Sequence, residues 1–220
     1  MTAGQKMIGE NGNENLLFPL EYMYVGTGYL PNGEHSATYW AMDFYGYDSN
    51  GRVQRCPYYA PCSCHAVRVS KSSSNPYVIW ESDNPVNYID GTIDYVYFLV
   101  AHDWNINDFN VGDTRSQGDL LGHTGNYGLS SGDHLHMYLG KGHYTGWTNV
   151  GTADNPIWRF ASQYHVYNAM GVNDTVIVRS GGNPWEEFIP YVPPEPPEPP
   201  TPTKKDIIPL SLVNALKWSV

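Results

Sequence analysis

A glycine-rich segment that leads into a His-Leu-His triplet constrains the fold more than any other part of the chain. Its spaced glycines are Gly122, Gly125, Gly128 and Gly132. Glycine allows tight turns and close backbone approach, which predicts a hairpin that leads into a strand at His134-Leu135-His136. Successive side chains on a strand point to opposite faces, so His134 and His136 share one face. Two imidazoles are therefore expected to face one spot.

The rest of the sequence favours β-structure. The chain has 220 residues, of which 41% are hydrophobic and 15% charged, with 22 Gly and 18 Tyr. Segments rich in β-branched and aromatic residues lie between Asn, Gly, Pro and Ser, at residues 38–47, 65–70, 76–82 and 93–104. This composition is not typical of a disordered chain or a coiled coil. We expect a mainly β, folded antiparallel sheet with long loops and few or no helices.

The sequence predicts one main domain followed by a spacer and a tail. Domains usually have about 100–200 residues, so residues 1–190 form one unit, with a core at about 17–145 and an aromatic extension. Residues 191–205 include VPPEPPEPPTPTKK, which is typical of an extended, semi-rigid linker. Residues 206–220 are apolar and are expected to dock on another component, as a short helix from Ser211; a frayed chain end is the alternative.

The charge argues against two classes of partner. With 12 basic and 22 acidic residues the formal net charge is −10, so the chain lacks the basic stripe of a nucleic-acid-binding surface or a membrane anchor. No run of about 18 apolar residues is present, which predicts no membrane span. The first residues also lack the apolar stretch of a secretory signal, so delivery to an extracellular substrate would need another route.

The cysteines leave two questions open. Cys56, Cys62 and Cys64 can form at most one internal disulfide, so the redox compartment is undecided. The segment Cys62-Ser63-Cys64-His65 is open to interpretation as part of a second zinc site, although it lacks paired C-x-x-C motifs. Small buried thiols are the other interpretation.

Five side chains of metal-binding or proton-transferring type can be assembled around one ion: His35, Asp43, His102, His134 and His136. A catalytic zinc usually has three protein ligands of the His and Asp/Glu types and keeps a fourth position for water. Two histidines then remain for acid-base chemistry, for which the pKa of imidazole is suited. A pair of surface histidines is the competing explanation for the triplet alone.

From about Gly33 to Tyr138 the sequence resembles the lysostaphin-type zinc endopeptidases, which cut peptidoglycan peptides. The resemblance rests on an early His and Asp, on Tyr59-Ala60-Pro61, on Phe98-Leu99-Val100-Ala101-His102, and above all on GHTGNYGLSSGDHLH at 122–136. It implies the folded β-sheet of that family, the duplicated hybrid motif. It further implies Zn²⁺ as cofactor, His35, Asp43 and His136 as zinc ligands, and His102 and His134 as the catalytic pair.

The spacing of the first two ligands departs from the family pattern. Seven residues, Ser36 to Met42, separate His35 from Asp43, where the family has about three. A straight strand would place their Cα atoms about 26 Å apart at about 3.3 Å per residue, too far to share a metal. His35 must therefore lie on a loop that folds back over Asp43. Glu34 is the alternative ligand.

Two tyrosines are candidates for substrate binding. Tyr29 in the TGY segment and Tyr127 in the glycine-rich segment are expected to line a groove for an extended peptide, with ordinary packing as the alternative.

The leading hypothesis is a zinc endopeptidase that hydrolyses a peptide bond in the stem or cross-bridge of peptidoglycan. It would be phage-encoded, as a virion tail enzyme or a released lysin, and would act in the virion or outside the cell. The tail at 206–220 would dock on another virion or lysin component. A secreted host enzyme is the other source. The alternative function is a non-catalytic wall-binding or structural virion module on the same fold.

Overall fold

The computed structural model describes residues 1–28, 35 and 40–194. Tyr29, the larger part of the predicted linker and the whole predicted docking tail lie outside the described residues.

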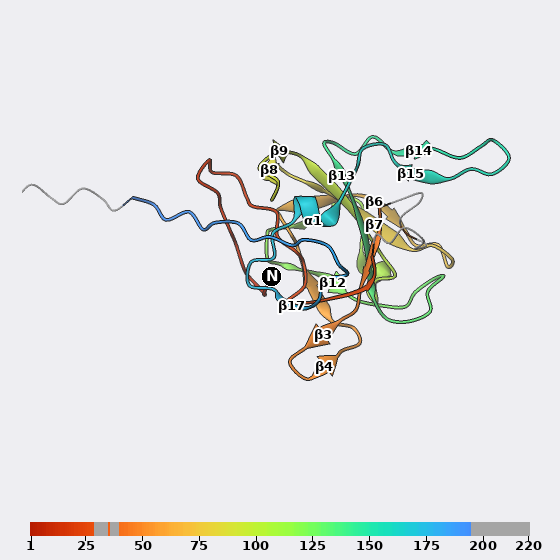
Figure 1. The fold of residues 1–220 in the computed structure, drawn as a ribbon. Coiled ribbons are helices and arrows are strands. Elements are labelled where there is room, and N and C mark those ends of the chain that lie inside the picture. The colour runs from red at the N-terminus through yellow and green to blue at the C-terminus, as the bar shows by residue number, and fades with distance from the viewer. Residues whose placement is uncertain (29–34, 36–39, 195–220) are drawn as a thin grey trace, which may run out of the picture.

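A nine-stranded sheet forms the body of the molecule (Figure 1). Its strand order is β11-β6-β7-β10-β13-β2-β1-β17, with β16 also paired to β13. Its strands are β1 Tyr22–Thr27, β2 Met42–Phe44, β6 Cys64–Ser70, β7 Tyr77–Ser82, β10 Val96–Ala101, β11 Thr114–Arg115, β13 Leu135–Lys141, β16 Gln163–Tyr164 and β17 Val176–Arg179. The pairs are antiparallel except β1 with β17, which is parallel. The prediction of a mainly β fold is confirmed.

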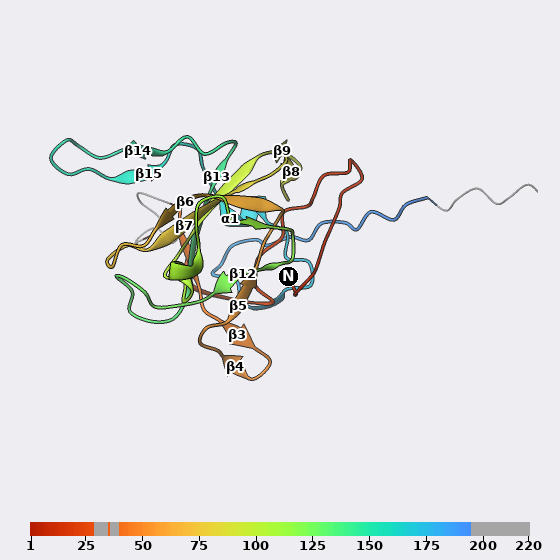
Figure 2. The same ribbon diagram turned by 180° about the vertical axis from the view of Figure 1, so that it is seen from behind.

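Four two-stranded pairs surround this sheet. They are β3 Tyr47–Asp48 with β4 Gly51–Arg52, β5 Pro57–Tyr59 with β12 Leu120–His123, β8 Val86–Asn87 with β9 Ile93–Asp94, and β14 Trp147–Asn149 with β15 Trp158–Phe160. The described helical elements are α1 Val166–Ala169 and a 3-10 turn at Ile106–Asp108. None of the helices in the described ranges is long and apolar enough to cross a membrane. Figures 1 and 2 show the β14–β15 hairpin projecting from one side of the body.

The prediction of a hairpin that leads into the His-Leu-His strand is wrong. β12 pairs with β5, and β13 takes β10 and β2 as partners. Only an isolated bridge joins Gly125 to His134. The glycines thus form a loop rather than a hairpin, because the long strand β13 satisfies its backbone groups on neighbours from distant parts of the chain.

Two other predicted strands differ in length. The strand that carries Asp43 is limited to Met42–Phe44 within the described residues. The segment 93–104 is divided into β9 and β10, because the Asp94 side chain accepts the backbone N–H of Tyr95 at 2.8 Å and interrupts the extended run. The aromatic extension after residue 141 joins the main sheet through β16 and β17.

The two faces of the main sheet bury different clusters. Alternate residues of β10 and β13, among them Phe98, Val100, Leu135 and Met137, pack in the main core. The residues between them, including Leu99, Ala101 and Tyr138, belong to a smaller cluster on the opposite face. Burial of each large apolar side chain stabilises the fold by about 1.5–3 kcal/mol. The main core therefore fixes which residues of each strand face the other side, where the candidate site lies.

The cysteines are free and buried. Cys62 and Cys64 pack in the main core, and burial raises the pKa of both thiols well above the usual value. His65 points away from them, with Nδ1 at 2.7 Å from Asp83 Oδ1. No cysteine belongs to a group with metal-binding geometry among the described residues. The interpretation of Cys62–His65 as a second zinc site is not supported.

Candidate functional site

Strand register places Asp43 beside His136. His136 on β13 is the register partner of Asp43 on β2 and of Ala101 on β10, and Ala101 pairs in turn with Tyr77 on β7. These residues form one row across the sheet, on the face opposite the main core. As a result, Nδ1 of His136 lies 2.9 Å from Oδ1 of Asp43.

His35 reaches the same carboxylate from the loop before β2. Its Nδ1 lies 3.7 Å from Asp43 Oδ2, and its ring is perpendicular to that of His136 with centroids 4.9 Å apart. His35 and Asp43 therefore lie close together, as the spacing argument requires.

The donor set of His35, Asp43 and His136 fits a zinc ion. One ligand atom from each residue lies within 4.8 Å of the other two, a criterion that His102, His134 and His136 also meet. Of the two sets, only the first contains a carboxylate. A tetrahedral zinc with bonds of about 2.0–2.1 Å holds its ligand atoms about 3.4 Å apart. The distances from His136 Nδ1 to Asp43 Oδ1, 2.9 Å, and from His35 Nδ1 to Asp43 Oδ2, 3.7 Å, lie on either side of that value. Two imidazoles and one carboxylate are also the ligand types that zinc prefers.

The charge state of Asp43 suits this role. Burial raises the pKa of Asp43, but hydrogen bonds and charges from His134 and His136 outweigh that effect and hold the pKa well below its usual value. The carboxyl group is therefore ionised at neutral pH, the form that binds a metal.

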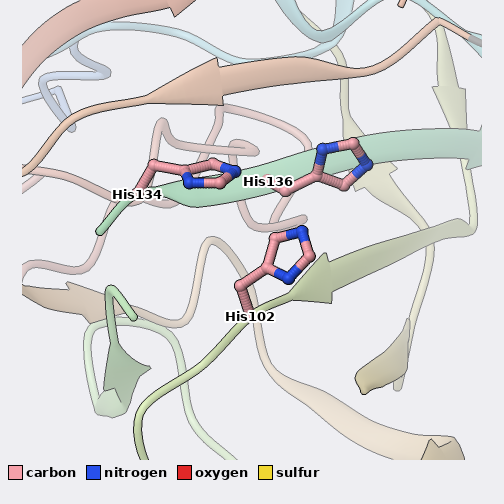
Figure 3. Close-up of side chains that lie close together, drawn as sticks. All are labelled: His102, His134 and His136. Atoms are coloured by element: carbon pink, nitrogen blue, oxygen red, sulfur yellow. The ribbon is translucent and has the colours of Figure 1, made fainter. Parts of the chain in front are cut away.

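His102 joins the site through an unusual backbone conformation. β10 ends at Ala101, and simple alternation would turn His102 toward the main core with Val100. Instead its φ of +64° lies in the left-handed region, which costs about 1–2 kcal/mol for a residue with a Cβ. The ring centroid of His102 then lies 5.0 Å from that of His134 and 5.7 Å from that of His136 (Figure 3).

Backbone carbonyls fix the tautomers of His102 and His134. Nδ1 of His102 lies 2.6 Å from the carbonyl oxygen of Tyr127, and Nδ1 of His134 lies 2.8 Å from that of Gly132. A carbonyl only accepts hydrogen bonds, so Nδ1 carries the proton in both rings and Nε2 is the atom that can take up another. Nε2 of His134 lies 3.3 Å from Asp43 Oδ1.

The two histidines have opposite pKa shifts. Burial, with smaller contributions from His136 and His134, lowers the pKa of His102 to about 4. Burial also lowers the pKa of His134, but its hydrogen bond and attraction to Asp43 outweigh this, so the net shift is upward. His102 is therefore neutral at pH 7, whereas His134 is more easily protonated.

One cavity of about 750 Å³ brings all five predicted residues together. It is lined by His35, Asp43, His102, His134 and His136, and its other lining side chains are uncharged. Tyr127 does not line this cavity. Its side chain is 40% exposed beside Trp104, with ring centroids 5.6 Å apart, while its carbonyl holds His102.

Comparison with known proteins gives several solved structures and curated relatives, among them a protein of Bacillus phage B103. No family model matches the chain. The relative, "Morphogenesis protein 1" of Bacillus phage B103, is 32% identical over 179 residues, which cover 81% of this chain and 46% of the relative. The chain thus spans about half the length of the relative.

The similar structures are peptidases. A zinc-containing peptidase from Vibrio cholerae is 16% identical with a TM-score of 0.39, covering 61% of this chain and 42% of that one. The catalytic domain of lysostaphin from Staphylococcus simulans is 20% identical with a TM-score of 0.38, covering 56% and 82%. The chain is similar to the lysostaphin-type zinc peptidases.

Gly125 joins the two catalytic segments predicted from the lysostaphin-type pattern. Gly125 and His134 exchange backbone hydrogen bonds of 3.0 and 3.3 Å. A Cβ at Gly125 would lie 2.2 Å from the carbonyl oxygen of His102. The close approach that the glycine run predicts therefore holds His102 and His134 next to each other in the cavity.

Two aspartates next to these histidines were missed in the sequence. Asp103 is buried and accepts hydrogen bonds from Tyr58 Oη at 2.5 Å, from the N–H of Asn105 at 2.5 Å and from the N–H of His123 at 2.9 Å. Burial raises the pKa of Asp103 to about 6, although these hydrogen bonds act in the opposite direction. Asp103 thereby anchors the chain just after His102.

Asp133 has the corresponding position before His134. It accepts hydrogen bonds from Thr124 Oγ1 at 2.5 Å and from the N–H of Arg55 at 3.1 Å. In the sequence, these two aspartates are marked only by their position next to His102 and His134. Their hydrogen-bond partners come from distant segments, which the sequence does not reveal.

Proposed function

We propose that this chain is a zinc-dependent endopeptidase that hydrolyses peptide bonds in the stem or cross-bridge peptides of peptidoglycan. The observation that carries the proposal is the meeting of a zinc-compatible donor set, His35, Asp43 and His136, with two further histidines in one cavity. The similarity to zinc peptidases and the sequence motif at 122–136 support the same conclusion.

Each of the five residues has a defined task in this proposal. His35, Asp43 and His136 would hold the zinc, which when bound supplies a Lewis acid that polarises the scissile carbonyl and acidifies water. His102 and His134 each offer Nε2, because their Nδ1 protons are held by carbonyl oxygens. One imidazole takes the proton of the attacking water, and the other, in its protonated form, stabilises the oxyanion. The leaving amine then receives a proton from this pair.

The biological setting that we propose is a phage particle. The relative from Bacillus phage B103 is named a morphogenesis protein, which favours a virion-associated enzyme over a released lysin. Docking of residues 206–220 on another virion component stays a prediction. Detection of the chain in purified particles tests this setting, and its presence only in lysates would contradict it.

The function is tested with zinc-loaded protein and purified peptidoglycan. We expect new amino termini to appear, and mass spectrometry of the released fragments to identify the bond. Asp43→Ala and His136→Ala should lose both bound zinc and activity, whereas His134→Ala should lose activity and keep zinc. His143→Ala serves as the control, since His143 is exposed and outside the cavity. Wall binding without new amino termini or stoichiometric metal would indicate the non-catalytic module instead.

A further inference from the structure

The sheet face that carries the site continues into an apolar row. Two residues beyond His136 on β13, Tyr138 is the register partner of Leu99, which also pairs with Ile79. This row lies about 7 Å along the strands from the row of Asp43 and His136. The cavity covers part of both rows, since Leu99 and Tyr138 line it together with the five site residues.

The β14–β15 hairpin is anchored on this apolar row. Phe160 on β15 is fully buried, with its ring centroid 4.5 Å from that of Tyr138 and 4.7 Å from that of Tyr97. Trp147 on β14 packs edge-on against Tyr138 and Tyr77, at 5.9 and 6.2 Å. The base of the hairpin is thus fixed against the sheet, while its far end projects from the body (Figure 1).

Trp158 extends this wall beyond the sheet. It lies two residues before Phe160 on β15, so both side chains are on the same face of the hairpin. Trp158 lines the cavity that contains the site, yet 56% of its surface is exposed. A large aromatic side chain that lines a cavity and is half-exposed is suited to bind an apolar group.

The lining of the cavity is mixed. Ser74, Asn75, Ser130 and Ser131 line it together with the exposed Leu129, whose N–H donates to the Ser74 carbonyl oxygen. Its aromatic and remaining large apolar lining residues are Tyr77, Leu99, Tyr138, Trp147 and Trp158. Apart from the site residues themselves, none of the described lining residues carries a charge. A substrate carboxylate beside these aromatic residues would lose water without gaining a partner, because no Lys or Arg is among the described lining residues.

We propose that the β14–β15 hairpin is a specificity wall, and that Trp147 and Trp158 hold a neutral, aliphatic segment of the substrate peptide on one side of the scissile bond. The substrate identity rests on the proposed function, but the aromatic wall does not. The serine and asparagine side chains that line the cavity accept the peptide segment beyond the bond, whose backbone groups they can hydrogen-bond.

The test compares Trp158→Ala with two matched variants. Val150→Ala alters a 39% exposed apolar residue of the same hairpin outside the cavity, and Trp158→Phe keeps an aromatic ring. Rates of amine release are measured on soluble stem peptides freed from glycan. For Trp158→Ala we expect KM to rise about tenfold with kcat within about twofold. Trp158→Phe should recover most of the loss, and Val150→Ala should match the unmodified protein.

A binding measurement keeps the two proposals distinguishable. Zinc-loaded His134→Ala protein, with and without Trp158→Ala, is titrated calorimetrically with the same stem peptides. Suppose that the unmodified protein releases no amino termini but Trp158→Ala weakens binding about tenfold. The endopeptidase proposal is then wrong, whereas the proposed binding of the peptide by the hairpin is supported. An unchanged KM and an unchanged affinity in Trp158→Ala would contradict the proposed role of the hairpin in binding. An effect limited to glycan-linked fragments would overturn the peptide assignment in favour of a sugar ring.

Discussion

Nδ1 of His136 lies 2.9 Å from Oδ1 of Asp43 because the two residues face each other across the β2–β13 ladder. No loop has to order for this pair to form. Only His35, the third member of the donor set, comes from outside the sheet, and it lies 3.7 Å from the same carboxylate.

Removal of the carboxylate should therefore abolish tight zinc binding. We expect Asp43→Ala to lower zinc affinity by more than about 100-fold, because one ligand is lost and the two remaining imidazoles lose their common partner. Equilibrium dialysis with zinc measures this directly. His143→Ala, in which an exposed histidine outside the cavity is removed, should bind zinc normally. Equal affinity of Asp43→Ala and the unmodified protein would remove Asp43 from the donor set.

Gly125 should tolerate no side chain. In Gly125→Ala the new Cβ would meet the His102 carbonyl oxygen at 2.2 Å, so the strand end or the loop must move. We expect a loss of about 2–4 kcal/mol in the free energy of unfolding by urea, together with reduced activity. Gly132→Ala is the control, since the nearest atom to its Cβ is a flexible arginine nitrogen at 3.7 Å. Similar stability losses in both variants would contradict the role of close packing at Gly125.

The buried pair of Tyr58 and Asp103 should influence catalysis through His102. Tyr58→Phe removes one donor from a buried carboxyl group, which costs about 1–3 kcal/mol and loosens the turn that follows His102. Tyr88→Phe is the matched control, because it removes a hydroxyl that donates to the Tyr95 carbonyl oxygen far from the cavity. Both variants should be less stable, but only Tyr58→Phe should lower kcat. A normal kcat in Tyr58→Phe would limit the pair to a structural role.

The stability of the metal-free protein should depend on the ionisation of His102. The folded pKa is about 4, below the value of about 6.5 in an unfolded chain. Between these values the unfolded state binds more protons, so the contribution of His102 to stability falls as the pH decreases from about 6.5 to 4. After allowance for solvent screening we expect about 1–2 kcal/mol.

His102→Asn tests this dependence, since asparagine tolerates the left-handed conformation at this position. Urea unfolding of chelator-treated protein at pH 4.5 and 7 measures the difference. The variant should lose less stability on acidification than the unmodified protein. An equal loss in both proteins would show that His102 is not buried in its neutral form.

One part of the site can be predicted from local sequence features alone. Alternation along a strand predicts that His134 and His136 share a face, and chain length alone requires the loop at His35 to fold back. Neither inference depends on knowing the strand partners. The roles of these residues stay predictions until metal binding and activity are measured.

The remaining features depend on contacts between distant segments. The glycine run fits a hairpin as well as a loop, and only the pairing of β12 with β5 distinguishes them. Nothing in the sequence around His102 indicates a left-handed residue, because histidine rarely adopts that conformation without tertiary support. The approach of Trp147 and Trp158 to the site is equally invisible, since it depends on where Phe160 packs.

The register between β2 and β13 has a consequence for how the protein reaches its active form. A slip of one residue would turn Asp43 into the hydrophobic core and expose Phe44, so core and metal site would be lost together. The three zinc ligands can therefore come together only when β2 and β13 are paired in this register. During refolding, only molecules in which β2 and β13 are paired in this register should bind zinc tightly. The bound ion would then stabilise that register.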